Sequence, residues 1–149
     1  VYLRRNDAGE TVVFREDDMQ EGVAVHYEPA LLLLPARLDP AEALPAQTVD
    51  VTVRRLDTGQ VRDRGTCDYR IARVTHETDD DEQRYRIVQR REIDLNLASA
   101  TVTIEAVHVP DRGRIAWSVE RRTRIFGLLG SDRHERYEVI ERVERTPRR

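Results

Sequence analysis

The stretch AQTVDVTVRRLDTG, residues 46 to 59, alternates apolar and polar side chains before it reaches a turn. Val49, Val51 and Val53 are separated by polar residues, and alternate residues of a β-strand point to opposite faces. The LDTG tetrapeptide, residues 56–59, is rich in the residue types that favour tight turns. The stretch therefore predicts a half-buried strand followed by a hairpin.

Similar alternation recurs along the chain, in residues 23–27, 85–95 and 102–106 among others. At the N-terminus, the NDAGE sequence joins two short runs and offers Gly9 for a turn with positive φ. We therefore expect an all-β, mainly antiparallel domain of about eight strands. The sheet should curl into a barrel, half-barrel or sandwich to bury its apolar face.

One expected strand contains an irregularity. Cys67, Tyr69 and Ile71 share a face, but Val74 falls out of phase with them. An extra residue in one strand restores the phase, so we expect a bulge near residues 72–73.

The only helix signal lies in LDPAEAL. Asp39 can cap a helix, Pro40 suits the first helical position, and Glu42 lies three residues after the cap. Because Pro45 follows, we expect at most a short helical turn near residues 39–44. The expected organisation of the single domain, residues 1–149, is N-terminal strands (1–28), a Leu/Pro strap (29–47), an antiparallel meander (48–145) and a tail (146–149).

The strap holds four consecutive leucines between prolines, in the sequence PALLLLP of residues 29–35. An extended run of four leucines points side chains to both sides, so burying all four requires apolar surface on both sides. A second apolar segment, IFGLLG of residues 125–130, stands where a hairpin tip should be polar. It either folds back over the open end of the sheet or forms an exposed contact for a partner or a membrane surface. We expect both segments to be connectors outside the strands.

Composition excludes several classes of protein. Of the 149 residues, 36% are charged and 39% are hydrophobic, which fits one globular domain. The 25 basic residues are all arginine, they are interleaved with acidic residues, and the net charge is −3. Nucleic-acid binding usually needs a basic patch, so we expect no nucleic-acid partner. No run reaches the roughly 18 apolar residues of a membrane span, so membrane anchoring would need a segment before Val1.

No catalytic or metal-binding motif stands out. The four histidines fall in different expected strands without metal-ligand spacing, and Cys67 is in phase with core residues. The sequence contains no nucleophile elbow and no phosphate-binding loop. We therefore expect no enzyme, no metal and no cofactor.

Several polar residues nevertheless fall in phase with the apolar face. A buried charge without a partner is costly, so these residues either lie beyond the edge of the core or line one end of a cavity. The set consists of Arg55, Gln89, Arg91, His108, Arg121 and Glu141.

The order of these features resembles a known type of domain. EPALLLLPARLDP, followed by alternating strands and by an arginine-rich strand with Trp117 that runs into RTRIFGLLG, is similar to small exported β-rich domains of unknown function. In those domains a P-G-x-x-W motif follows the strap. Pro40 matches its proline, and Ala41 and Leu44 stand in place of its glycine and tryptophan. The resemblance implies an exported, non-catalytic domain, similar in shape to the half-barrels of lipoprotein carriers.

These observations lead us to expect an extracytoplasmic binding domain, although they leave a cytoplasmic location open. Its concave face and strap should bind a hydrophobic ligand or a protein partner. The alternative is an assembly module that forms a homo-oligomer through the leucines. The expected contact residues are Leu31, Leu32, Leu33, Leu34, Tyr69, Trp117, Phe126, Leu128 and Leu129.

Overall fold

The computed structural model describes residues 1–37, 39, 41, 45–79, 82–110, 113–125 and 131–138. Within these residues the chain forms one antiparallel sheet of nine strands, arranged in sequence order from β1 to β9. The strands are β1 (Tyr2–Arg5), β2 (Thr11–Asp18), β3 (Val23–Leu34), β4 (Ala46–Arg55), β5 (Val61–Asp79), β6 (Glu82–Leu95), β7 (Ala98–Val109), β8 (Gly113–Ile125) and β9 (Ser131–Glu138). The predicted all-β class is confirmed.

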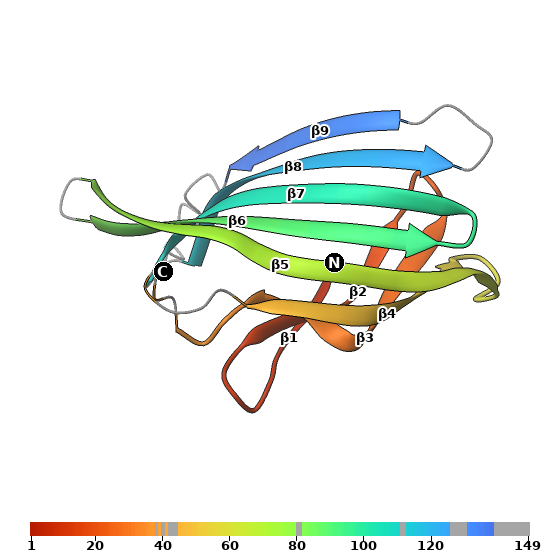
Figure 1. The fold of residues 1–149 in the computed structure, drawn as a ribbon, viewed down its shortest axis with the longest axis horizontal. Helices are drawn as coiled ribbons and strands as arrows, with labels where there is room; N and C mark the ends of the chain where they lie inside the picture. Colours follow the sequence, from red (N-terminus) through yellow and green to blue (C-terminus); the bar gives the residue numbers. More distant parts are fainter. Residues whose placement is uncertain are drawn as a thin grey trace, which may run out of the picture.

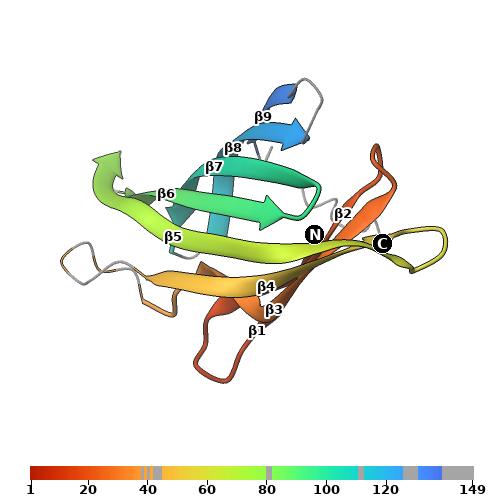
Figure 2. The ribbon, with the colours of Figure 1, turned by 45° about the vertical axis from the view of Figure 1, so that its right-hand side comes forward.

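The sheet curls into a half-barrel. Strands β4 to β8 form a curved layer, and β1 to β3 turn round behind it (Figures 1 and 2). In the described part of the chain β1 and β9 pair with one neighbour each, so they are the two edges of an open sheet. The inner face of the curl is the face that becomes buried.

The core consists of the inward positions that the alternation predicts. Val49, Val51 and Val53 of β4 are buried, as are Cys67 and Tyr69 of β5. The turn at residues 56–59 is present, and Gly59 has a φ of 69°. The period-two pattern was therefore sufficient to assign the buried face of these strands.

A predicted bulge and a predicted hairpin are also confirmed. The register of β5 with β6 shifts between Ile71 and Arg73, where we expect the bulge. At the N-terminus, β1 and β2 form the predicted hairpin, and Gly9 has a φ of 80°. Most of the expected helical turn, residues 40 and 42–44, lies outside the described residues. Within it, Asp39 accepts a hydrogen bond from the backbone N–H of Ala41 at 2.9 Å.

The four leucines form the second half of strand β3. Leu31 pairs with Val13 of β2, and Leu32 pairs with Val12. The expectation of a connector outside the strands is therefore wrong for these residues, because β2 offers a partner for their backbone. Leu31 and Leu33 are buried, while Leu32 and Leu34 are half-buried and still pack against the core.

A glutamine side chain replaces the backbone ladder where β3 leaves β4. The pairing of β3 with β4 ends at Glu28 and Asp50. Beyond that point, Gln47 Oε1 accepts a hydrogen bond from the N–H of Leu32 at 2.9 Å, and its Nε2 donates to the carbonyl of Ala30 at 3.2 Å. The leucine half of β3 therefore keeps a hydrogen-bonded connection to β4.

We expect Leu31→Ala to lower the free energy of unfolding by about 2 to 5 kcal/mol, because the side chain is 0% exposed and its removal leaves a cavity. The half-buried Leu34→Ala should cost less. Urea denaturation of both variants measures the difference. Equal losses would show that the two halves of the leucine run are not buried differently.

Gly65 of β5 lies against the backbone of β6. A Cβ at this position would come within 1.8 Å of the Asp94 carbonyl oxygen. We expect Gly65→Ala to cost about 3 kcal/mol or to prevent folding, because backbone cannot move aside as a flexible side chain can. The control is Gly22→Ala, where a Cβ meets no atom within 4 Å and the φ of 64° costs about 1 to 2 kcal/mol. A larger loss in the control, measured by thermal unfolding, would contradict this expectation.

Candidate functional site

The inner face of β6 carries two polar side chains in an apolar wall. Gln89 and Arg91 are 1% and 3% exposed. Their partners across the neighbouring β7 ladder, Ile104 and Val102, are buried apolar residues. The interior beside β6 and β7 therefore has two polar groups set among apolar ones.

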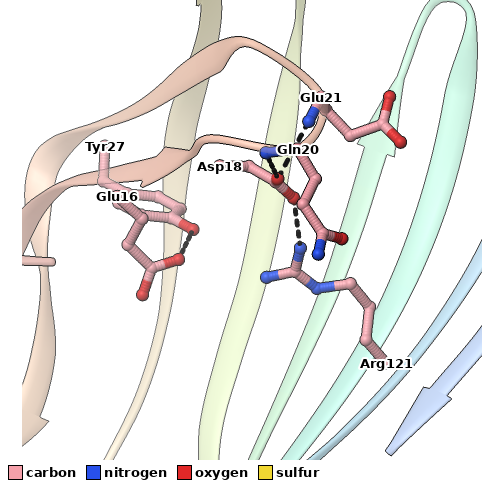
Figure 3. A network of polar contacts seen from close by, with 6 residues as sticks. All are labelled: Glu16, Asp18, Gln20, Glu21, Tyr27 and Arg121. Atoms are coloured by element: carbon pink, nitrogen blue, oxygen red, sulfur yellow. Dashed lines mark hydrogen bonds and ion pairs between the residues drawn. The ribbon is translucent and has the colours of Figure 1, made fainter.

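Arg91 forms an ion pair across the interior with β2. Its NH1 group lies 2.8 Å from Glu16 Oε1, and the two residues are 75 positions apart in sequence. The hydroxyl of Tyr27, on β3, donates a hydrogen bond to Glu16 Oε2 at 2.9 Å (Figure 3). The guanidinium of Arg91 also lies 5.9 Å from the centre of the Tyr27 ring. Three strands therefore meet at one charged cluster.

Charge and burial act in opposite directions on Glu16. Burial raises the pKa of this carboxyl, but the charge of Arg91 and hydrogen bonds from Arg91 and Tyr27 outweigh it and hold the pKa below its usual value. Burial and the neighbouring Glu16 also raise the pKa of the Tyr27 hydroxyl. Glu16 is therefore ionised near neutral pH, while the Tyr27 hydroxyl stays protonated and donates a hydrogen bond to it.

A second ion pair lies closer to the rim. Arg121 of β8 contacts Asp18 Oδ2 of β2 at 3.3 Å. Asp18 Oδ1 accepts hydrogen bonds from the N–H groups of Gln20 and Glu21 at 3.0 and 3.1 Å (Figure 3). Asp18 therefore both shapes the turn after β2 and connects that turn to β8.

Every described hydrogen bond between β2–β3 and β6–β8 involves at least one side chain. No backbone ladder joins these two groups of strands in the described residues. Besides the two ion pairs, Gln89 Nε2 donates to the carbonyl oxygen of Leu33. Within the same described part, Gln89 Oε1 and Arg91 Nε are buried and have no hydrogen-bond partner. The candidate site thus retains acceptor and donor capacity inside the curl.

The polar residues in phase with the apolar face were expected either to lie beyond the edge of the core or to line one end of a cavity, and they differ in their burial. Arg55 is exposed, as expected for a strand that extends past the core. Gln89, Arg91 and His108 are buried, so that reading is wrong for them, because the sheet curls over their positions. Arg121 is half-exposed and paired. The sixth member, Glu141, lies outside the described residues.

The predicted contact residues are brought together only in part. Leu31, Leu33 and Tyr69 belong to one buried cluster. Trp117 is half-buried on β8, opposite Ala106 of the inner face, and is not part of that cluster. Leu32 and Leu34 pack at the margin of the cluster. The remaining three predicted contacts, Phe126, Leu128 and Leu129, lie outside the described residues.

Sequence analysis missed the acidic side of the site. Val13 points inward, and an unbroken alternation would then place Arg15 inside. The register instead shifts around Phe14, so Glu16 and Asp18 take the inward positions. The local sequence carries no turn or glycine that marks this shift.

Three observations describe the chemistry and the hydropathy of the described residues. Burial raises the pKa of the Cys67 thiol to about 11, so the thiol stays protonated at neutral pH. No group of three or more His, Cys, Asp or Glu side chains in the described ranges is placed to hold a metal ion. The same ranges contain no helix with the length and hydropathy of a membrane span.

We expect Glu16→Gln to lower the free energy of unfolding at pH 7 by about 3 to 5 kcal/mol, because it leaves the buried Arg91 charge without its counterion. The matched control is Glu92→Gln, at an exposed position of β6, and it should change stability by less than about 0.5 kcal/mol. Chemical denaturation measures both. A loss in the control as large as that at Glu16 would contradict this role for the ion pair.

The same pair should make stability depend on pH. Because folding lowers the pKa of Glu16, its contribution is fully present above the unfolded pKa, near 4.5, and is lost as pH falls through the folded pKa. Melting temperatures measured from pH 7 to pH 3 should therefore fall less steeply for Glu16→Gln than for the wild type. Parallel curves would contradict the lowered pKa.

Comparison with known proteins adds no relative to this description. No protein-family model, curated protein or solved structure matches the chain. The candidate site is therefore interpreted from its own geometry and charge.

Proposed function

We propose that this chain is a non-catalytic binding domain that holds an apolar ligand against the concave face of its sheet. The inner face of β6 and β7 offers Ile87, Val102 and Ile104 as an apolar wall. Gln89 and Arg91 interrupt this wall with an amide and a guanidinium. Ligand sites commonly combine a mainly apolar lining with a few polar groups that orient the ligand.

Two buried polar atoms carry this proposal. Gln89 Oε1 and Arg91 Nε find no hydrogen-bond partner among the described residues. Leaving such an atom buried and unsatisfied costs about 1 to 3 kcal/mol. A ligand with a polar group beside an apolar chain would satisfy these atoms if it entered between β6 and the strands that now cover its inner face.

The chemistry of the site favours binding over turnover. The Cys67 thiol is buried and protonated, so it is a poor nucleophile. Glu16 is held in an ion pair with Arg91, which disfavours its use as a general acid or base at neutral pH. Both groups act here as structural elements of the interior.

Two other parts of the functional expectation stay predictions. An extracytoplasmic location follows only from the resemblance to exported half-barrel domains. Assembly through the leucines now depends on Leu32 and Leu34, because Leu31 and Leu33 are buried within the chain's own core.

The single tryptophan provides a test. Trp117 lies on the inner-face side of β8, so a ligand on the concave face should shift its fluorescence. We expect native mass spectrometry and solvent extraction of the purified protein to reveal a bound amphiphile, and palmitate to blue-shift Trp117 emission. Gln89→Leu should weaken palmitate binding several-fold. The matched control, Arg90→Leu, changes an exposed neighbour on the opposite face and should not.

Failure has a clear signature. A protein that carries no extractable ligand and shows no change in Trp117 emission up to millimolar palmitate would overturn the proposal. Equal effects of the two substitutions would also overturn it, because binding would then not involve the concave face.

A further inference from the structure

Strand β1 is an open edge of the sheet. It pairs with β2 on one side, and no strand of the described ranges pairs with its other side. Exposed edges offer unpaired backbone N–H and C=O groups to any further strand. Tyr2 and Leu3 are 45% and 50% exposed, so this edge also presents apolar surface.

The outward surface beside this edge is built from stacked aromatic and arginine side chains. The rings of Tyr2 and Phe14 lie 6.1 Å apart. The guanidinium of Arg15 lies 4.9 Å from the Tyr2 ring centre, and that of Arg4 lies 5.9 Å from the Phe14 ring centre. The two rings are tilted by 53° to each other, and they remain accessible to a partner because Phe14 is 37% exposed.

A hollow of about 500 Å³ adjoins the stack. It arises where the register of β2 and β3 shifts, because Phe14 lies opposite residues 27–30 of β3 between the pairs Val13–Leu31 and Arg15–His26. Phe14, Pro29 and Ala30 line it, together with two basic residues, Arg4 and Arg54, and two acidic ones, Glu28 and Asp50. The hollow is large enough for a single apolar side chain of a partner.

The charge of the edge distinguishes between occupants. Strand β1 contains Arg4 and Arg5 and no acidic residue. Neither arginine forms an ion pair with a described residue, whereas Arg15 is neutralised by Asp17 at 2.6 Å. A second copy that paired through its own β1 would bring four arginines together, which is unfavourable between adjacent strands. An acidic segment would instead meet complementary charge.

We propose that an acidic, extended segment of a protein partner adds to β1 as a further strand and places an apolar side chain in the adjoining hollow. Backbone hydrogen bonds along the edge supply affinity, and the hollow and the two arginines supply selectivity. This surface is the open edge at β1, so it is distinct from the inner face of β6 and β7 proposed to hold a ligand.

Fluorescein-labelled peptides test this surface on the full chain. The probe is an acetylated peptide that alternates valine with glutamate, and the comparison peptide has lysine in place of glutamate. We expect the acidic peptide to bind at least tenfold more tightly by fluorescence anisotropy. On binding, hydrogen exchange of the β1 amides should slow. Higher salt should weaken the complex, since the charges are exposed.

Matched charge reversals locate the site. The Arg4→Glu/Arg5→Glu double variant should lose at least tenfold in affinity for the acidic peptide and gain affinity for the lysine peptide. The control is Arg70→Glu/Arg90→Glu, which makes the same charge change at two exposed, paired positions of β5 and β6. Circular dichroism confirms that both variants fold. If the β1 variant is unfolded, Arg4→Gln/Arg5→Gln replaces it, with a smaller expected loss, and Arg70→Gln/Arg90→Gln becomes its control.

Three results would overturn the proposal. The first is no binding of the acidic peptide up to 1 mM, or equal binding of both peptides. The second is an equal loss in the two charge-reversal variants. The third is a wild-type dimer by light scattering that the β1 variant abolishes, because a second copy would then occupy the edge. Palmitate binding should be unchanged in the β1 variant, so failure here is distinct from failure of the ligand site.

Discussion

The ion pair between Glu16 and Arg91 is the contact on which the curl of the sheet depends most. A nine-strand meander with two free edges has no backbone ladder in its described part to hold its first strands against its later ones. The pair connects β2 to β6 at 2.8 Å, and the Tyr27 hydroxyl fixes the carboxylate between them. Removing one partner leaves the other charge buried and unpaired. This lowers the free energy of unfolding by far more than the intact pair contributes to it. Asp18 and Arg121 repeat this connection at the rim.

The polar interior and the leucine half of β3 are parts of one solution. Leu31 and Leu33 belong to the buried core between β3 and the curved layer. The carbonyl oxygen of Leu33 accepts a hydrogen bond from the Gln89 side-chain amide of β6. Gln47 holds the same half-strand to β4. The leucines therefore gain apolar surface on one side from the sheet and hydrogen-bonded neighbours at their backbone. Leu32 and Leu34 alternate with Leu31 and Leu33, stay half-buried and contact only the margin of the core.

The two proposed surfaces separate by face and by chemistry. The concave face combines apolar residues with Gln89 and Arg91, and it suits a small amphiphile. The open edge at β1 has Tyr2, Phe14 and Arg4 on its outer side and Arg5 on the other side of the strand, and it suits an extended acidic chain. A sheet can present two such surfaces because alternate residues of each strand point to opposite sides.

Period-two alternation in the sequence determined the all-β class, the inward valines of β4, the buried Cys67 and Tyr69, and the bulge before Arg73. These depend on local geometry, in which neighbouring side chains of a strand must face opposite ways. Only the tertiary structure decided that Glu16 faces Arg91 and that the leucines belong to a strand. A register shift near Phe14 changes which residues of β2 point inward, and pairing between residues 75 positions apart depends on how far the whole sheet curls.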